Sequence, residues 1–207
     1  MFTVGPVAEN CFIFRRDGSD KALIVDPGDE GPKLLKAIED LGVTLDGILL
    51  THTHFDHVGA VAEVARATGA EVWVPEIEKP VLADINRYQP FPGIGPFESY
   101  EAEHTVAGGE QLQLAGFDID VIFTPGHSPG HVTYAVPDEQ ALFSGDVLFQ
   151  GSVGRTDLPG GDWPTLAASI ATLLEHYPDE TTVLPGHMGV TTLGTERASN
   201  PFLAELV

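Results

Sequence analysis

Three histidines and one aspartate fall within six residues of this chain, in the run THTHFDH at positions 51–57. Neutral imidazole and carboxylate groups are ligands for zinc and other divalent first-row metals. His52 and His54 are two positions apart, so both can project the same way from an extended segment. Asp56 and His57 follow at a turn and can point elsewhere. One metal would be crowded by four such groups, whereas two neighbouring metals would share them.

The elements around this run place it at the end of a strand. The apolar residues 47–50 predict a short buried strand, and the apolar residues between 58 and 65 recur at helical spacing. In open α/β folds, ligands collect beyond the carboxyl ends of the strands. We therefore expect the metal-binding side chains to lie at such an edge.

Three further strand ends carry a ligand of the same type. His127 stands among glycines and prolines after an alternating segment, a backbone suited to a fixed and unusual geometry. Asp146 ends an apolar run, and its two oxygens can bridge two metals. His187 follows the last predicted strand. Each of the three is a candidate metal ligand.

Asp26 also ends a predicted strand, at residues 22–25, and a Pro-Gly pair follows it. A carboxylate in this position is often only a turn residue. The alternative is that it accepts a hydrogen bond from a metal-bound histidine and orients the ring. The sequence leaves both interpretations open.

The amino-acid composition of the chain indicates which macromolecules are not expected to bind it. The 207 residues are 43% hydrophobic and carry 31 acidic against 10 basic side chains, a formal net charge of −21. Such a charge repels nucleic acids and anionic membrane surfaces, so we expect neither as a partner. The single cysteine, Cys11, excludes an internal disulfide. With no signal-peptide pattern and no apolar run of membrane length, the predicted location is the cytoplasm.

Predicted strands and helices alternate along the rest of the chain, which favours an α/β layered fold. Helices are expected from about Asp29 to Gly42, through residues 58–68, and from Asp162 onward. No repeat, low-complexity segment or linker divides the chain. One domain spanning residues 1–207 is therefore the simplest prediction.

These motifs, in this order, resemble those of the metallo-β-lactamase superfamily, and within it the short glyoxalase II-like proteins. The matching positions are Asp26, THTHFDH, His127, Asp146 and His187. The resemblance covers essentially the whole chain and implies an αββα four-layer sandwich. It implies two divalent metal ions, zinc for preference, with iron or manganese as the other options. The implied ligands are His52, His54 and His127 on one metal, Asp56, His57 and His187 on the other, and Asp146 bridging them.

Glyoxalase II-like proteins hydrolyse S-acyl-glutathione thioesters such as S-lactoylglutathione, and the resemblance implies a thioester of this kind as the small-molecule partner. No Ser-His-Asp or Cys-His arrangement stands out in the sequence, so the predicted nucleophile is a water between the metals, whose pKa falls toward about 7. Asp56 is a candidate proton acceptor as well as a ligand. A thiol has a pKa of about 8.5, so the thiolate can leave without a strong general acid.

Arg155, in the glycine-rich segment 151–162, is the candidate contact for an anionic group on the substrate. It stands where the two-domain glyoxalase II enzymes place a lysine, and Asp157 falls about where they place a tyrosine. We also expect the basic C-terminal extension of those enzymes to be missing. Since Asp157 would repel a carboxylate, a thiol carrier other than glutathione remains open.

Two alternatives stay open at this point. A persulfide dioxygenase of the same superfamily would use one iron held by His52, His127 and Asp146, the two-histidine, one-carboxylate arrangement of non-haem oxygenases. A non-catalytic metal-binding module would keep the ligands without turnover. β-Lactam hydrolysis is less expected of a cytoplasmic chain.

Overall fold

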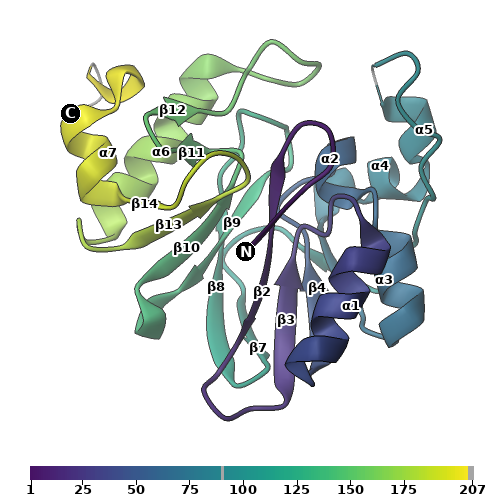
Figure 1. Ribbon diagram of the computed structural model, residues 1–207. Coiled ribbons are helices and arrows are strands. Elements are labelled where there is room, and N and C mark those ends of the chain that lie inside the picture. Colours follow the sequence, from purple (N-terminus) through teal and green to yellow (C-terminus); the bar gives the residue numbers. More distant parts are fainter. Residues whose placement is uncertain (90, 205–207) are drawn as a thin grey trace. The chain divides into compact units, whose positions relative to one another are not determined.

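The computed structural model describes residues 1–89 and 91–204, which form two compact units. Unit 1 comprises Met1–Val106 and Gln113–Phe117, and unit 2 comprises Ala107–Leu112 and the described residues from Asp118 onward. Each unit is built around a six-stranded sheet with helices beside it (Figure 1).

The sheet of unit 1 has the strand order β1-β2-β3-β4-β5-β6, antiparallel from β1 to β3 and parallel from β3 to β6. Its strands are β1 (Phe2–Val4), β2 (Glu9–Arg15), β3 (Lys21–Val25), β4 (Thr44–Leu49), β5 (Val72–Pro75) and β6 (His104–Val106). Its helices are α1 (Gly31–Leu41), α2 (Phe55–Val58), α3 (Val61–Thr68), α4 (Lys79–Ala83) and α5 (Ile85–Tyr88), with the 3-10 turn η1 (Glu76–Glu78). Figure 1 shows α1 and α3 side by side, and residues of the two helices are in contact.

The core of unit 1 explains why its central strands read as unbroken apolar runs. Ile24 of β3 and Ile48 of β4 are fully buried, and Leu34 of α1 packs in the same cluster with Val61 and Val64 of α3. Parallel strands flanked by crossover helices are shielded from water, so their sequences need not alternate. The buried strand β4 leads directly into the histidine-rich segment.

The helix expected through residues 58–68 is instead two helices, α2 and α3. A side chain at Gly59 would overlap the carbonyl oxygen of Gly28, and a side chain at Gly28 would overlap that of Asp56. The turn after β3 therefore packs backbone to backbone against the segment after β4, an approach that glycine allows. The helix is interrupted where this turn meets it.

The second sheet, most of whose residues belong to unit 2, has the order β14-β13-β10-β9-β8-β7. Its strands are β7 (Gln111–Leu114), β8 (Phe117–Phe123), β9 (Val132–Val136), β10 (Ala141–Gly145), β13 (Thr182–Pro185) and β14 (Thr191–Thr192). β10 and β13 are parallel, while β8–β9, β9–β10 and β13–β14 are antiparallel. The remaining elements are the ribbon β11 (Leu148–Phe149) and β12 (Ser152–Val153), the helices α6 (Trp163–His176) and α7 (Leu193–Ser199), and the 3-10 turns η2 (Pro137–Glu139) and η3 (Pro201–Leu203).

Helix α6 begins where the sequence predicted. Asp162 is its N-cap, and the Asp162 carboxylate accepts a hydrogen bond from the Thr165 N–H at 2.9 Å. Its apolar face, with Leu166 and Ile170, packs against Leu142 of β10 in one buried cluster. Neither α6 nor any other helix in the described part of the chain is long and apolar enough to cross a membrane.

Candidate metal centre

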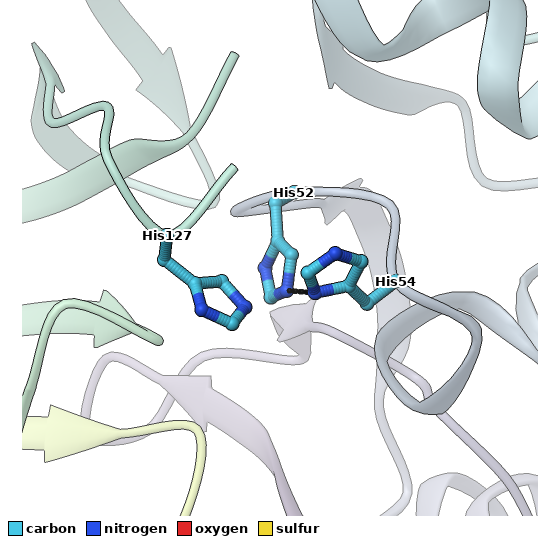
Figure 2. Close-up of side chains that lie close together, drawn as sticks. All are labelled: His52, His54 and His127. Carbon is cyan, nitrogen blue, oxygen red and sulfur yellow. Dashed lines mark hydrogen bonds between the residues drawn. The ribbon is translucent and has the colours of Figure 1, made fainter. Parts of the chain in front are cut away.

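His52 and His54 lie in the loop that joins β4 to α2, and Figure 2 shows the interaction between their rings as a dashed line. His52 Nε2 and His54 Nδ1 are 3.1 Å apart. Two nitrogens bound to one tetrahedral zinc, each at 2.0–2.1 Å, lie about 3.3 Å apart. The two imidazoles are therefore spaced as two ligands of a single ion.

Hydrogen bonds from Thr51 fix which nitrogen of His52 carries the proton. The Thr51 hydroxyl donates to Asp26 Oδ2 at 2.6 Å, so its oxygen is left to accept a hydrogen bond from His52 Nδ1, which lies 3.1 Å away. A neutral imidazole protonated on Nδ1 has its lone pair on Nε2. His52 can therefore bind a metal through Nε2 without rearranging.

Asp26 acts as an acceptor for the groups around it, which supports the orienting role over that of a simple turn residue. Its Oδ1 accepts a hydrogen bond from the Thr51 N–H at 2.8 Å, and its Oδ2 accepts one from His57 Nδ1 at 3.0 Å. The residue is 2% exposed and has a φ of 48°, a conformation that costs a non-glycine residue about 1–3 kcal/mol. The surrounding hydrogen bonds hold Asp26 in this strained position.

Asp56 and His57, the last two residues of the motif, lie within α2. Because His57 Nδ1 donates to Asp26, its lone pair is on Nε2, which lies 3.8 Å from Asp56 Oδ2. The ring of His57 packs 4.1 Å from that of His52, and donor atoms of Asp26, His52 and His57 lie within 4.8 Å of one another. Unit 1 thus supplies the four predicted ligands of the THTHFDH segment from one loop and one helical turn.

Two buried carboxylates support this loop and were missed by sequence reasoning. Glu78 of η1 accepts hydrogen bonds from the N–H and the hydroxyl of Thr53, at 3.2 and 2.6 Å. Glu9, at the start of β2, has no exposed surface and places Oε1 3.9 Å from His57 Nδ1. Both are far from their partners in the sequence and outside any motif, so no local signal marks them.

In unit 2, Asp146 brings together the other two predicted histidines. Its Oδ2 lies 3.4 Å from His127 Nε2 and 3.6 Å from His187 Nε2. The three residues follow the ends of β8, β10 and β13, as the sequence predicted. One carboxylate oxygen beside two imidazole nitrogens is the arrangement expected of a ligand shared between cations.

The backbone of the glycine-rich loop orients His127, which Figure 2 draws on its own loop after β8. His127 Nδ1 donates to the carbonyl oxygen of Arg155 at 2.7 Å, which leaves the lone pair on Nε2. Gly154 makes this possible, because a side chain there would overlap the carbonyl oxygen of Asp146. The glycines of this loop therefore serve close packing around the ligands.

The side chain of Arg155 is paired within the chain. Its Nε and Nη2 donate to the two carboxylate oxygens of Asp157 at 2.6 and 2.7 Å, and both side chains are exposed. The paired charges raise the pKa of Arg155 and lower the pKa of Asp157. The substrate contact of Arg155 stays a prediction, and a substrate carboxylate would have to compete with Asp157 for it.

His131 supports the backbone of Asp146. It is fully buried, and its Nε2 accepts a hydrogen bond from the backbone N–H of Asp146 at 3.0 Å. Its proton is therefore on Nδ1, which faces the hydroxyl oxygen of Thr124 at 3.1 Å. This hydrogen bond fixes the backbone that carries the Asp146 carboxylate.

We expect His131→Leu to lower the free energy of unfolding by about 1–3 kcal/mol, because the buried N–H of Asp146 loses its acceptor. Urea-induced unfolding of the two proteins measures the difference. His176→Leu is the matched control, since His176 is exposed at the end of α6, and its effect should stay within about 0.5 kcal/mol. Equal losses in the two variants would contradict this role for His131.

The donor set of the predicted ligands fits divalent metals that accept nitrogen and oxygen. Five imidazoles and two carboxylates suit zinc, iron or manganese. The only thiol of the chain, that of Cys11, is fully buried in β2, and burial raises its pKa. The residues present therefore fit the metals that the resemblance implied.

Known proteins resemble this chain over nearly its full length. Residues 4–187 match the metallo-beta-lactamase superfamily. The probable metallo-hydrolase YqgX of Bacillus subtilis is 43% identical, and the match covers 97% of this chain and 94% of the relative. The hydroxyacylglutathione hydrolase GloC of Haemophilus influenzae is 38% identical, over 94% of this chain and 92% of the relative.

Solved structures agree with the sequence matches. The BLEG-1 B3 metallo-beta-lactamase is 40% identical and superposes with a TM-score of 0.92, covering 98% of this chain and 97% of its own. TTHA1623, in a di-iron-bound form, is also 40% identical, with a TM-score of 0.80 and 98% of both chains covered. These similarities confirm the predicted α/β fold class. Metal-dependent hydrolysis is the type of chemistry found in the family. The chain belongs to the metallo-β-lactamase superfamily.

Proposed function

We propose that this protein is a metal-dependent hydrolase of thioesters. The main support for the proposal is that His52, His57 and His127 share one hydrogen-bonding pattern. Each is hydrogen-bonded through Nδ1 to a protein acceptor, so each has Nε2 free of a proton for a metal. The similarity to a hydroxyacylglutathione hydrolase supports the thioester as substrate.

Seven side chains of the chain are the proposed ligands of two metal ions. One ion would be held by His52, His54 and His127, the other by Asp56, His57 and His187, and both by Asp146. Divalent cations held there would supply an activated water and polarise a carbonyl group. The identity of the ions, whether zinc, iron or manganese, is part of the proposal to be tested.

Other residues of the chain orient the proposed ligands, and one of the ligands is the proposed proton acceptor. Asp26 fixes the ring of His57, and His131 fixes the backbone of Asp146. Asp56 is the proposed acceptor of the proton that the attacking water loses. The thiolate product needs no proton from the protein in order to leave, because its conjugate acid has a pKa of about 8.5.

Purified protein should hydrolyse S-lactoylglutathione or a related thioester, and a chelator should abolish the reaction. The measurement is the loss of thioester absorbance with and without chelator, beside elemental analysis of the protein as isolated. Adding back zinc, iron or manganese separately should restore activity and identify the metal. Hydrolysis that survives complete metal removal, or none by fully metallated protein across several thioesters, would refute the proposal.

A second candidate is β-lactam hydrolysis, favoured by the 40% identity to the BLEG-1 B3 metallo-beta-lactamase. The same ligands would serve, because an amide in a strained ring is also a carbonyl electrophile. A chromogenic cephalosporin in the same assay series compares the two classes by kcat/KM. Oxygen uptake with glutathione persulfide in place of hydrolysis would favour the dioxygenase instead.

A further inference from the structure

A pocket of about 270 Å³ opens in unit 1 beside the THTHFDH segment. Asp56, a proposed metal ligand, is part of its lining, together with the aromatic side chains of Phe55 and Phe97. A group bound in this pocket would therefore lie next to a proposed metal ligand. We name it the Phe55–Phe97 pocket.

The apolar side of the Phe55–Phe97 pocket is firmly built. The two rings stack with centroids 5.6 Å apart, and Ile94 lines the pocket beside them. Asn86 of α5 holds Phe97 by two hydrogen bonds to its backbone, at 2.7 and 2.8 Å. Gln89 holds the carbonyl oxygen of Ile94 at 2.6 Å. The aromatic wall is thus fixed in place by side chains of the same unit.

The polar side of the pocket is acidic. Of the described residues that line it, two are carboxylates, Asp29 and Asp56, and none is basic. Asp56 would be neutralised by the metal that it binds, which leaves Asp29 as the remaining charge. Asp29 Oδ1 accepts a hydrogen bond from the Glu30 N–H at 2.6 Å, which orients its carboxylate.

Two cations of unit 1 are already paired with acidic side chains. Lys33 of α1 binds Glu30 at 2.6 Å, and Arg66 of α3 binds Glu98. The net charge of −21 further disfavours anions near the protein surface.

We propose that the Phe55–Phe97 pocket selects thioesters of neutral or cationic thiols over those of anionic thiols such as glutathione. This rests on the proposed thioester hydrolase function and names its substrate class. An apolar segment gains from the aromatic wall. A quaternary ammonium group also gains from the faces of the rings, while a carboxylate meets Asp29.

One acyl group carried on four thiols tests the proposal by kinetics. The thiols are N-acetylcysteamine (neutral), thiocholine (cationic), and 3-mercaptopropionate and glutathione (both anionic). With lactoyl as the common acyl group, we expect kcat/KM for the neutral and cationic thioesters to exceed that for the anionic pair by about tenfold or more, the size of one close unfavourable charge pair. Added salt should narrow the gap.

Asp29→Asn is the deciding variant, because it removes the charge and keeps the oxygen that accepts from the Glu30 N–H. It should shift the kcat/KM ratio of anionic to neutral thioester toward one. Asp17→Asn, at an exposed turn, is the matched control and should leave that ratio unchanged. A glutathione thioester that equals or exceeds the neutral one, or a ratio that Asp29→Asn does not move, would overturn the assignment of substrate class.

Binding of non-hydrolysable thioethers separates this inference from the proposed function. The S-benzyl derivatives of N-acetylcysteamine, thiocholine and glutathione can be compared by calorimetry on the metal-loaded protein. Failure of the hydrolase proposal would appear as absent turnover of every thioester, whatever the binding order. Failure of the charge selection would appear as equal or tighter binding of the glutathione derivative.

Discussion

Asp146→Ala should reduce thioester hydrolysis by at least about 10²-fold and lower the number of metal ions bound per chain. Loss of an outer partner of a ligand already costs roughly 10–100-fold in affinity or activity, and Asp146 is proposed to touch both ions. Its Oδ2 lies within 3.6 Å of both His127 Nε2 and His187 Nε2, so alanine would leave these imidazoles without the anion between them. Steady-state kinetics and elemental analysis of the purified variant measure the two effects.

Two histidine variants calibrate this result. His54→Ala should lose activity to a similar extent, because it removes one of the two nitrogens spaced 3.1 Å apart in the THTHFDH loop. His176→Ala should keep full activity, since its Nδ1 only donates to the carbonyl of Thr172 within α6. Equal effects of Asp146→Ala, His54→Ala and His176→Ala would show that the ligands are wrongly assigned.

Asp26→Asn should weaken metal binding by roughly 10–100-fold and lower the free energy of unfolding by about 1–3 kcal/mol. The carboxylate accepts three hydrogen bonds, from the N–H and hydroxyl of Thr51 and from His57 Nδ1. An amide offers only one oxygen, so its NH₂ group must face at least one buried donor. Metal titration with a competing chelator and urea unfolding of the metal-free protein give the two quantities.

The exposed Asp17 supplies the matched control for this change. Asp17→Asn should leave metal affinity and stability unchanged within error, because it alters one surface charge. If Asp26→Asn unfolds like the native protein and binds metal as tightly, Asp26 is a turn residue after all. A loss of stability alone, with unchanged affinity, would limit its role to the fold.

The candidate ligands could be located from the sequence because each one is tied to a local pattern. His127, Asp146 and His187 each follow a recognisable strand, and the structure places all three beyond strand ends. The apolar run of a strand predicts where the strand ends. A residue just after that end can therefore be located from the local sequence alone. Their joint action on two metals, and the single domain over residues 1–207, stay predictions.

The supporting residues could not be predicted because their partners are remote in sequence. Glu78 meets Thr53 across 25 residues, and His131 meets the N–H of Asp146 across 15. A buried glutamate or histidine has no pattern that names its partner, and only the packed backbone brings the two together. The pair of Arg155 with Asp157 is different, since the two residues are close in sequence but their spacing alone does not indicate that the side chains pair.

Arg155 contributes to the candidate metal centre through its carbonyl oxygen, which accepts a hydrogen bond from His127 Nδ1. Its guanidinium group binds Asp157 instead. Every amino acid has that carbonyl, so the identity of the residue at position 155 is uncoupled from the orientation of the imidazole. A substitution at position 155 would therefore change the charge that the loop presents and leave the backbone acceptor of His127 in place.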